Sequence, residues 1–573
     1  MALETPPQRI ERHLKTIYPE CAGEVLPRIR QLTEQYACQF SDRVVPDQLW
    51  SERDVVLITY GDQVSEEGQP SLATLQTFLT EFRLQNALPI VHLLPFCPYS
   101  SDDGFSVIDF RRIDERLGDW ELVRNLGQQF NLMFDLVLNH VSQHSDWFQS
   151  FINGDQKAAG WFHAVDPDED LSRVTRPRSH PLLTPFTTAN GERHIWTTFS
   201  EDQVDLNYSE PAVLLEMLDI LLSYVANGAR IIRLDAIAFL WKEIGTTCLH
   251  LPQTHAVVKL FRAVLDEVAP DVVLLTETNV PHAENVSYFG DGDEARMVYQ
   301  FSLPPLLFDA YVNEDASPLR TWLEDLETPA EGTTWFNFTA SHDGIGVRPL
   351  EGIVEGDRFE RLIDATRDRG GQVSMRQMPN GDLRPYELNI TWSDAMRTPG
   401  ETDSLHIRRV LASQAFMLAL QGVPAVYFHS LVGTPNDAAG AEQSGHARSI
   451  NRRKFSFAEL LDLLTNDPGQ SAVFDGYRRL LSIRNVQPAF HPDARQQVLE
   501  TNDPAVVAFV RECSENGQRI LVAANFSHAS RKFSVAEFVK ESKWCDLIEN
   551  VTYAGESVAL AAYQIVWLAP DSD

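Results

Sequence analysis

The feature that most constrains the fold of this chain is a series of eight short apolar runs. Each run has the length of a buried strand, and a longer stretch with helical character separates it from the next. Buried strands that alternate with helices are typical of a parallel sheet covered by helices. Eight such units close a barrel, so we predict an α/β fold with a (β/α)8 TIM barrel. The runs occupy residues 54–60, 88–96, 131–140, 229–237, 271–279, 297–304, 333–343 and 424–431.

The remaining segments predict further domains, because 573 residues exceed the size of a single hydrophobic core. We assign the barrel to residues 51–486 and expect a helical N-terminal extension over residues 1–50. Two insertions rich in Pro, Gly and charge interrupt the barrel: an insertion domain B at about 141–207 and a second insertion at about 350–400. Short alternating strands over residues 487–573 indicate a C-terminal antiparallel β domain.

The stretch before the fourth run carries the local signals of a covering helix. Ser209 is a candidate N-cap, Pro211 falls in the first turn, and Gly228 follows the end. One face between them is apolar and consists of Leu214, Met217, Leu218, Leu221, Leu222 and Val225. This spacing predicts an amphipathic helix that lies on the sheet.

The charge balance limits the partners that the protein can have. Lys and Arg number 48 against 81 Asp and Glu, and a net charge of −33 disfavours nucleic acid and anionic membranes. No run approaches the roughly 18 apolar residues of a membrane span, and residues 1–8 lack the features of a secretory signal. The six cysteines show no metal-ligand spacing, which is typical of free thiols in a reducing compartment. We expect a cytoplasmic monomer or homodimer.

Four acidic residues lie at the polar ends of predicted strands: Asp135, Asp235, Glu277 and Asp343. The carboxyl ends of parallel barrel strands surround one pore mouth, so these four side chains are expected to meet there. A single acidic residue at a strand end is more often a loop cap or a salt-bridge partner. A cluster of four is costly, and it indicates a functional site.

The neighbours of these carboxylates favour glycoside chemistry, which needs one protonated carboxyl group and one ionised carboxylate. Arg233 stands two residues before Asp235, on the same side of the strand, and favours an ionised nucleophile there. We expect Arg230 beside the same carboxylate. The apolar neighbours of Glu277 favour a raised pKa and a role as general acid/base. Asp343 is then expected to bind sugar hydroxyls and help distort the ring.

Four strings around these residues resemble, in order, the four signature regions of the α-amylase superfamily of glycoside hydrolases. They are DLVLNH (135–140), RIIRLDAIA (230–238), LLTETN (274–279) and FTASHD (338–343). The resemblance implies a retaining double displacement with Asp235 as nucleophile, Glu277 as acid/base and Asp343 as transition-state stabiliser.

Narrower strings are similar to the sucrose phosphorylase subgroup: LITYGD (57–62), LPFCPYSSDDGFSVIDF (94–110), GTTCLH (245–250), FSLPPLL (301–307), SHDGIG (341–346) and SINRRKF (449–455). In this subgroup phosphate, rather than water, intercepts the glucosyl-enzyme and releases α-glucose 1-phosphate. The resemblance implies a set of glucose-binding residues, namely Asp102, Phe105, His140, Phe199, Arg233, His342 and Arg448.

An incoming phosphate needs a cationic pocket, and the first insertion offers one. The segment SRVTRPRSH (172–180) supplies Arg173, Arg176, Arg178 and His180, and the last three are the candidate residues for binding phosphate or the acceptor. Guanidinium groups bind phosphate and carboxylate through paired hydrogen bonds. A solvated basic loop on an acidic protein is the alternative interpretation of this segment.

Within the subgroup, several segments look most like glucosylglycerate phosphorylases. They are the N-terminal extension, the RPR segment followed by PLLTPF (181–186), WKEIGTTCLHLPQTH (241–255), and TETNVPH (276–282), where sucrose phosphorylases usually have EVH in place of ETN. This resemblance implies a glycosyltransferase that acts as a phosphorylase. Its expected reaction is the reversible phosphorolysis of 2-O-α-D-glucosyl-D-glycerate to α-D-glucose 1-phosphate and D-glycerate, with the sugar and phosphate as its small-molecule partners.

Three alternatives stay open at this point. A sucrose or sucrose 6-phosphate phosphorylase takes a different acceptor, a hydrolytic α-glucosidase shares the carboxylates, and a non-catalytic barrel usually loses one of them. Asn139 and Asp205 resemble calcium ligands of amylases, but phosphorylases of this kind generally need no metal. We predict no metal and no cofactor, because inorganic phosphate is a substrate.

Overall fold

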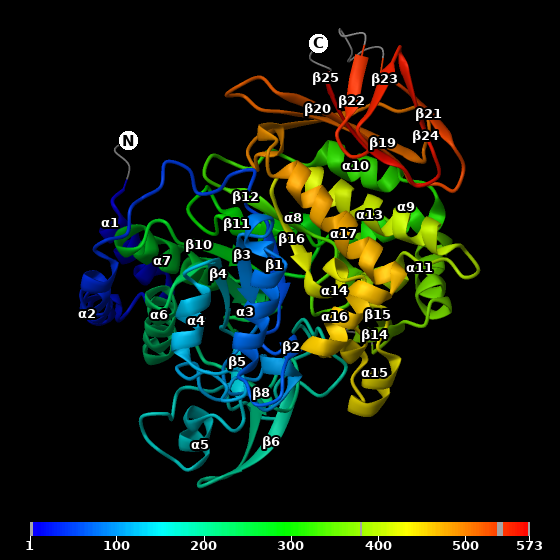
Figure 1. Ribbon diagram of the computed structural model, residues 1–573. Helices are drawn as coiled ribbons and strands as arrows, with labels where there is room; N and C mark the ends of the chain where they lie inside the picture. Colours follow the sequence, from blue (N-terminus) through cyan, green and yellow to red (C-terminus); the bar gives the residue numbers. More distant parts are fainter. Residues whose placement is uncertain (1–3, 379–380, 536–542, 571–573) are drawn as a thin grey trace.

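The computed structural model describes residues 4–378, 381–535 and 543–570, and its centre is a closed barrel of eight parallel strands (Figure 1). Seven of the predicted apolar runs contain one of these strands, and the eighth, 424–431, overlaps a strand that begins one residue earlier, which confirms the barrel. The strands are shorter than the runs, because the polar residues at the end of most runs leave the sheet and enter loops. In chain order the barrel strands are β1 (Val56–Thr59), β3 (Ile90–Leu93), β4 (Asn131–Val137), β9 (Ala229–Asp235), β10 (Val273–Thr276), β11 (Met297–Tyr299), β12 (Thr334–Phe338) and β16 (Val423–Tyr427).

Helices surround the barrel, and the one before β9 shows why they form. Helix α6 (Pro211–Ala226) buries the predicted apolar face against the sheet. Its N-cap is Glu210 rather than Ser209, because the Glu210 carboxylate accepts the backbone N–H of Ala212 at 3.3 Å. The hydroxyl of Ser209 instead donates to Asn207 Oδ1 at 2.6 Å. Other surrounding helices are α3 (Ser71–Glu81), α4 (Trp120–Leu126), α7 (Pro252–Val268), α9 (Leu303–Asn313), α13 (Asp403–Ala419) and α17 (Pro468–Arg484).

The N-terminal segment forms two helices, α1 (Pro6–Ile17) and α2 (Ala22–Phe40), which pack on α7 and α6 outside the barrel (Figure 1). Arg9 forms an ion pair with Asp266 of α7 at 2.9 Å. The buried hydroxyl of Tyr18 donates to the carbonyl of Tyr208 at 2.7 Å. These contacts make the two helices a covering layer on the barrel helices.

Two insertions follow the carboxyl ends of barrel strands. The first, after β4, contains β5 (His140–Ser142), α5 (Asp146–Ile152), β6 (Leu183–Thr188), β7 (Gly191–Trp196) and β8 (Gln203–Asp205). It forms the lower edge of the molecule in Figure 1. The second, after β12, contains β13 (Ile345–Gly346), η5 (Arg348–Leu350), α11 (Asp357–Asp368), β14 (Gln372–Gln377) and β15 (Leu383–Asn389), with the three strands in the order β13-β15-β14.

The C-terminal segment forms a six-stranded antiparallel sheet at the top of Figure 1. It packs on α13, where Phe416 meets Phe509 with 5.6 Å between ring centroids. The sheet consists of β18 (Arg495–Leu499), β19 (Val506–Glu512), β20 (Arg519–Asn525), β25 (Ile565–Pro570), β22 (Lys543–Asp546) and β23 (Val551–Ala554), and β21 (Arg531–Ser534) pairs with β24 (Ser557–Leu560) beside it.

Two further observations bear on the setting of the protein. Within the part of the chain that the structure describes, no helix combines the length and apolar character needed to cross a membrane. Cys97, Cys248 and Cys513 are buried as free thiols.

Candidate active site

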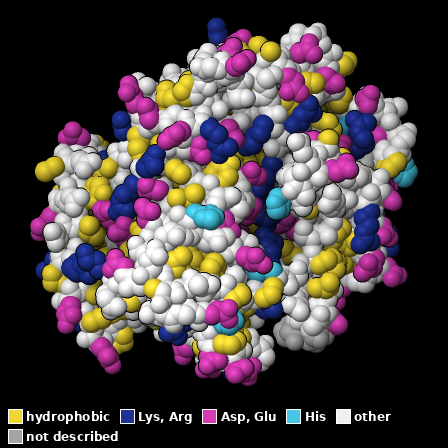
Figure 2. Space-filling model, turned by 90° about the horizontal axis from the view of Figure 1, so that it is seen from below, with side chains coloured by type: hydrophobic (Ala, Val, Ile, Leu, Met, Phe, Trp, Pro, Cys, Tyr) yellow, Lys and Arg dark blue, Asp and Glu magenta, His cyan; other side chains and the backbone are white. Residues whose placement is uncertain are grey.

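A cavity opens at the carboxyl ends of the barrel strands, between the two insertions. Seen from below, the molecule is hollowed near its centre, where basic and acidic side chains gather (Figure 2). Most of the site residues that the sequence predicts line this cavity: Asp102, Phe105, His140, Arg176, Arg178, Phe199, Asp235, Glu277, His342, Asp343 and Arg448.

Arg233 lies beneath the cavity and organises its acidic floor. Its Nη1 is 2.7 Å from Asp235 Oδ1 and also contacts Asp135, which His92 holds from the other side at 2.6 Å. Burial alone would raise the pKa of Asp135, but Arg233 and His92 lower it to about 2. Asp135 therefore stays ionised and serves to hold Arg233 rather than to line the cavity. The same guanidinium reaches Glu277 at 4.0 Å through Nη2.

The two carboxyl groups near Arg233 both have raised pKa values. Burial raises the pKa of Asp235, with Arg233 opposing the rise and Glu277 adding to it. Burial also raises the pKa of Glu277, against the pull of Arg233. Because Arg233 is 2.7 Å from Asp235 and 4.0 Å from Glu277, it stabilises a negative charge on Asp235 more strongly. The geometry therefore favours the ionised form at Asp235 and the protonated form at Glu277.

The backbone after β9 fixes the relative position of these two groups. Ala236 adopts a left-handed conformation with φ of 52°, directly after Asp235. Its N–H donates to Glu277 Oε2 at 3.1 Å. The carboxyl of Glu277 is thereby tied to the residue next to Asp235, which keeps the two groups close together, as a retaining mechanism requires.

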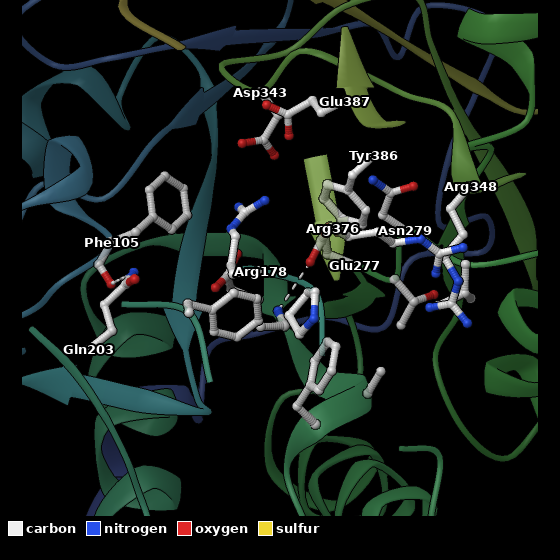
Figure 3. A pocket seen from close by; sticks show the side chains of 18 of the residues that line it. Phe105, Arg178, Gln203, Glu277, Asn279, Asp343, Arg348, Arg376, Tyr386 and Glu387 are labelled. Carbon is white, nitrogen blue, oxygen red and sulfur yellow. Dashed lines mark hydrogen bonds between the residues drawn. The ribbon is translucent and has the colours of Figure 1, made fainter. Parts of the chain in front are cut away.

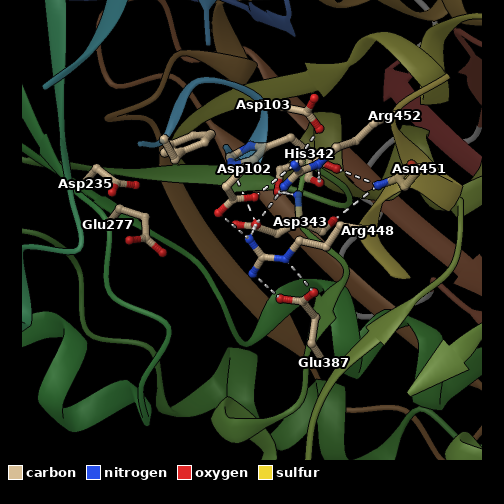
Figure 4. A network of polar contacts seen from close by, with 12 residues as sticks. Asp102, Asp103, Asp235, Glu277, His342, Asp343, Glu387, Arg448, Asn451 and Arg452 are labelled. Atoms are coloured by element: carbon tan, nitrogen blue, oxygen red, sulfur yellow. Dashed lines mark hydrogen bonds and ion pairs between the residues drawn. The ribbon is translucent and has the colours of Figure 1, made fainter. Parts of the chain in front are cut away.

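Asp343 belongs to a network of charges on another wall of the cavity (Figure 4). Its Oδ1 is 2.6 Å from Arg448 Nη1, and Arg448 also donates twice to the buried Glu387, at 3.0 and 2.7 Å. Burial would raise the pKa of Asp343, but the positive charges of Arg448 and Arg452 lower it well below its ordinary range. Asp343 is therefore ionised, and Glu387 holds the arginine that keeps it so.

A second arginine holds the loop after β3. Arg452 Nη1 is 3.1 Å from Asp102 Oδ1 and 2.8 Å from Asp103 Oδ2. Both aspartates have left-handed backbone angles, which the ion pairs help to maintain. The loop presents Asp102 to the cavity, 3.8 Å from Arg448 Nη1.

Aromatic side chains close the wall next to this network. The ring of Phe105 stacks on His342 with 4.6 Å between centroids and 9° between planes. The carbonyl of Phe105 lies 2.9 Å from His140 Nε2, and the His140 ring packs against Phe199 at 5.3 Å. Burial lowers the pKa of His342 to about 3, so this imidazole is neutral. The result is a half-apolar, half-charged wall suited to a sugar ring.

Asn139 and Asp205, the two residues that resemble calcium ligands, contact the ammonium group of a lysine. Lys242 Nζ lies 2.7 Å from Asp205 Oδ2 and 2.6 Å from Asn139 Oδ1, and it also donates to the carbonyl of Phe239 at 2.6 Å. The side chain of Lys242 is only 3% exposed. A cation thus stands between these oxygen atoms, but it is an ammonium group of the chain itself.

The basic residues of the first insertion divide between two places. Arg176 and Arg178 line the cavity, and the guanidinium of Arg178 lies over the ring of Tyr386 at 5.3 Å. His180 lies outside this cavity and faces the neighbouring one, where its Nε2 is 2.8 Å from the carbonyl of Thr197.

The expectation that Arg230 lies beside Asp235 is wrong. Arg230 lies at the opposite end of the barrel from Asp235, where its Nη2 donates to the carbonyl of Leu49 at 3.1 Å. Arg230 is the second residue of β9 and Asp235 the last, and the rise of about 3.3 Å per residue separates them along the strand.

The structure adds residues that the sequence did not single out: Gln203, Asn279, Arg348, Arg376, Tyr386 and Glu387 all line the cavity. Arg348 belongs to η5, Arg376 to β14, and Tyr386 to β15 in the second insertion. One available signal was Asn279, the unusual asparagine at the end of the third signature string.

Two family models match the chain. The model Alpha amylase, catalytic domain, matches residues 89–345, and the model Maltogenic Amylase, C-terminal domain, matches residues 496–567. The second match coincides with most of the C-terminal sheet.

Relatives match over nearly the whole length. The glucosylglycerate phosphorylase of Allomeiothermus silvanus is 50% identical over 500 residues, covering 87% of this chain and 89% of that protein. The glucosylglycerate phosphorylase of Escherichia coli is 42% identical over 522 residues, covering 91% and 92%. A sucrose phosphorylase of Agrobacterium vitis is 32% identical, covering 77% and 89%. Among solved structures, the sucrose 6F-phosphate phosphorylase from Thermoanaerobacter thermosaccharolyticum has a TM-score of 0.73 at 22% identity, covering 88% and 98%, which supports the barrel fold.

Proposed function

We propose a function from the premise that this chain belongs to the α-amylase superfamily and, within it, to the family of the glucosylglycerate phosphorylases. The protein is a retaining phosphorylase. It cleaves 2-O-α-D-glucosyl-D-glycerate reversibly with phosphate, and the products are α-D-glucose 1-phosphate and D-glycerate. The observation that carries this proposal is the pair of carboxyl groups on Arg233 beside a wall of arginines, on a chain whose net charge is −33.

The first half of the reaction cleaves the glycosidic bond. The ionised Oδ of Asp235 attacks the anomeric carbon while Glu277 gives its proton to the oxygen of the departing glycerate. The bond to glycerate breaks, an ester between glucose and Asp235 forms, and Glu277 becomes a carboxylate. Asp343, which is ionised in its network with Arg448, stabilises the positive charge that develops on the sugar ring.

The second half transfers the glucosyl group to phosphate. A phosphate oxygen attacks the anomeric carbon from the side that glycerate has left, and Glu277 takes up the phosphate proton. The ester bond to Asp235 breaks and the carboxylate is restored beside Arg233. Two inversions retain the α-configuration. Arg176 and Arg178 line the cavity, and we assign them to binding phosphate in this step.

The proposed function is tested by measuring phosphorolysis with several α-glucosides. The expected result is phosphate-dependent release of glucose 1-phosphate from 2-O-α-glucosylglycerate at a higher kcat/KM than from sucrose, sucrose 6-phosphate or glucosylglycerol. A preference for sucrose, or turnover of glucosylglycerate that does not depend on phosphate, would contradict it.

We propose further that the reaction needs no metal and no cofactor. The support is Lys242, whose ammonium group binds Asn139 and Asp205, the two residues that resemble calcium ligands. Chelation with EDTA is therefore expected to leave the rate of phosphorolysis unchanged. A loss of activity that added calcium restores would contradict this part of the proposal.

The cellular setting also belongs to the proposal. We infer a cytoplasmic monomer or homodimer that binds neither nucleic acid nor membranes. The net charge of −33 and the buried thiols of Cys97, Cys248 and Cys513 support this setting. Light scattering coupled to size-exclusion chromatography distinguishes monomer and dimer from larger assemblies, which would contradict the inference.

A further inference from the structure

We propose that Arg348 and Arg376 recognise the carboxylate of the acceptor and so determine the specificity of the enzyme for an acidic acceptor. This inference rests on the proposed function and deepens it. It concerns two residues of the second insertion that no signature string contains.

Arg348 and Arg376 lie on the side of Glu277, the general acid, that faces the acceptor. In Figure 3, Glu277 stands between Phe105 and Gln203 on one side and Asn279 and Arg348 on the other. A general acid must face the oxygen of the leaving group, and the sugar ring lies on the side of the aromatic wall. The residues beyond Glu277 therefore face the leaving acceptor.

The backbone around Arg348 ties this loop to the acid/base segment. A Cβ atom at Gly346 would overlap the side-chain amide of Asn279, so β13 lies directly against the residue two positions after Glu277. Only glycine permits this approach. A packed contact between two segments far apart in the sequence thus holds the loop of Arg348 against the segment that carries Glu277.

Both arginine side chains are mostly buried, and their guanidinium groups are incompletely paired. The side chains of Arg348 and Arg376 are 12% and 11% exposed. Arg348 Nη2 reaches Glu284 at 3.3 Å, and Arg376 pairs with Glu351. The Nε atoms of both arginines are buried without a hydrogen-bond partner.

This arrangement leaves donors for an anion inside the cavity. The carboxylates of Glu284 and Glu351 are 40% and 46% exposed, so each arginine is held by a partner that is itself largely in solvent. A guanidinium that is mostly buried and has unused donors is stabilised most by a planar carboxylate, because the carboxylate accepts two parallel hydrogen bonds.

The chemistry of the acceptor fits this position. In 2-O-glucosylglycerate the carboxyl group is bonded to the carbon that carries the glycosidic oxygen, so it must lie close to Glu277. Glycerol has a neutral hydroxymethyl group at that place. A site built to pair with the carboxylate rejects such an analogue, because its buried donors are then left without partners.

Another cavity beside the catalytic one, distinct from the cavity that His180 faces, supplies a control residue. Arg173, Arg176, Arg348 and Arg376 line this outer cavity, and no acidic side chain of the described residues does so. Arg173 is exposed and does not line the catalytic cavity. Arg173→Gln removes the same charge from the same region without removing a contact to the acceptor.

The test uses α-glucosyl fluoride as donor, because its leaving group, fluoride, has no carboxylate and does not need the acceptor-binding residues to depart. Transfer of glucose to D-glycerate and to glycerol is measured for the wild type, Arg348→Gln, Arg376→Gln and Arg173→Gln. Glycerol serves as an internal control for folding and for formation of the glucosyl-enzyme. Arg348→Lys and Arg376→Lys, which keep the charge, replace any glutamine variant that does not fold.

The expected result is a loss of about 100-fold in kcat/KM for glycerate in each glutamine variant, with transfer to glycerol changed less than about 3-fold. The lysine variants are expected to lose about 10-fold for glycerate, because they lose the paired geometry. Arg173→Gln should match the wild type.

Two results would overturn the inference: an equal loss for both acceptors, or no loss for glycerate. A loss in Arg173→Gln as large as in the other variants would also do so, because it would indicate general attraction of anions. If the wild type itself failed to transfer glucose to glycerate, that result would contradict the proposed function. Failure of the proposed function can thus be distinguished from failure of the inference about Arg348 and Arg376.

Discussion

The guanidinium of Arg233 contacts the carboxylate of Asp235, with 2.7 Å between Nη1 and Oδ1. The two residues stand two positions apart on β9 and therefore face the same side of the strand. Burial opposes the ionised form of Asp235, and the positive charge of Arg233 favours it. The predictions below follow from this pair and from the contacts around it.

Replacement of the nucleophile is expected to abolish turnover. Asp235→Asn keeps the shape of the side chain, but the amide cannot form the ester with glucose. We expect phosphorolysis below about 10⁻³ of the wild-type rate. Asp155→Asn, an exposed position in the first insertion, serves as the matched control. Residual activity of Asp235→Asn above this level would argue against the nucleophile assignment.

The pH profile is expected to report the proton on Glu277. Burial raises the pKa of this carboxyl, so it stays protonated to higher pH than an ordinary glutamic acid. As the pH rises through that pKa, the acid is lost and kcat/KM for glucosylglycerate should fall. With α-glucosyl fluoride, whose leaving group needs no proton, formation of the glucosyl-enzyme should not show this alkaline decline. The same decline with both donors would count against Glu277 as general acid.

Glu387 is expected to act through Arg448 as a positioning residue. It is buried and accepts two hydrogen bonds from the guanidinium that contacts Asp343. Glu387→Gln weakens this charged pair, and we expect kcat/KM to fall about 10-fold to 100-fold. The fall should appear mainly in KM for the glucoside, while the pH profile keeps its shape. Glu355→Gln, an exposed position of the same insertion, is the control. A shifted pH profile would instead indicate a direct role in proton transfer.

Removal of the ammonium group of Lys242 is expected to destabilise the fold. Lys242→Met leaves the buried carboxylate of Asp205 without its opposite charge, at a cost of about 3–5 kcal/mol. We expect a lower Tm by differential scanning calorimetry. Lys157→Met, at an exposed position, should match the wild type. An unchanged Tm in Lys242→Met would show that Asp205 does not depend on the lysine.

The barrel and its catalytic carboxylates were predictable from the sequence, because both rest on local patterns. A buried parallel strand appears in the sequence as a short apolar run. The polar residues at its carboxyl end lie at the mouth of the barrel, whatever segment follows the strand. Asp235, Glu277 and Asp343 each lie at the polar end of such a run, so their meeting in one cavity required only the closure of the barrel. The same local logic was wrong for Arg230, which belongs to the beginning of β9 and therefore to the other end of the barrel.

The tertiary structure alone decided which residues of the insertions line the cavity. Arg348 comes from η5, and Arg376, Tyr386 and Glu387 come from the bulged hairpin of β14 and β15. The packing of these elements has no periodic signal in the sequence. Their places depend on contacts between distant segments, such as that of Gly346 with Asn279. The sequence by itself determined the barrel and the chemistry at its strand ends, because strand periodicity acts between neighbouring residues. The acceptor wall and the ammonium group of Lys242 between Asn139 and Asp205 were decided by the packing of loops, which no local pattern encodes.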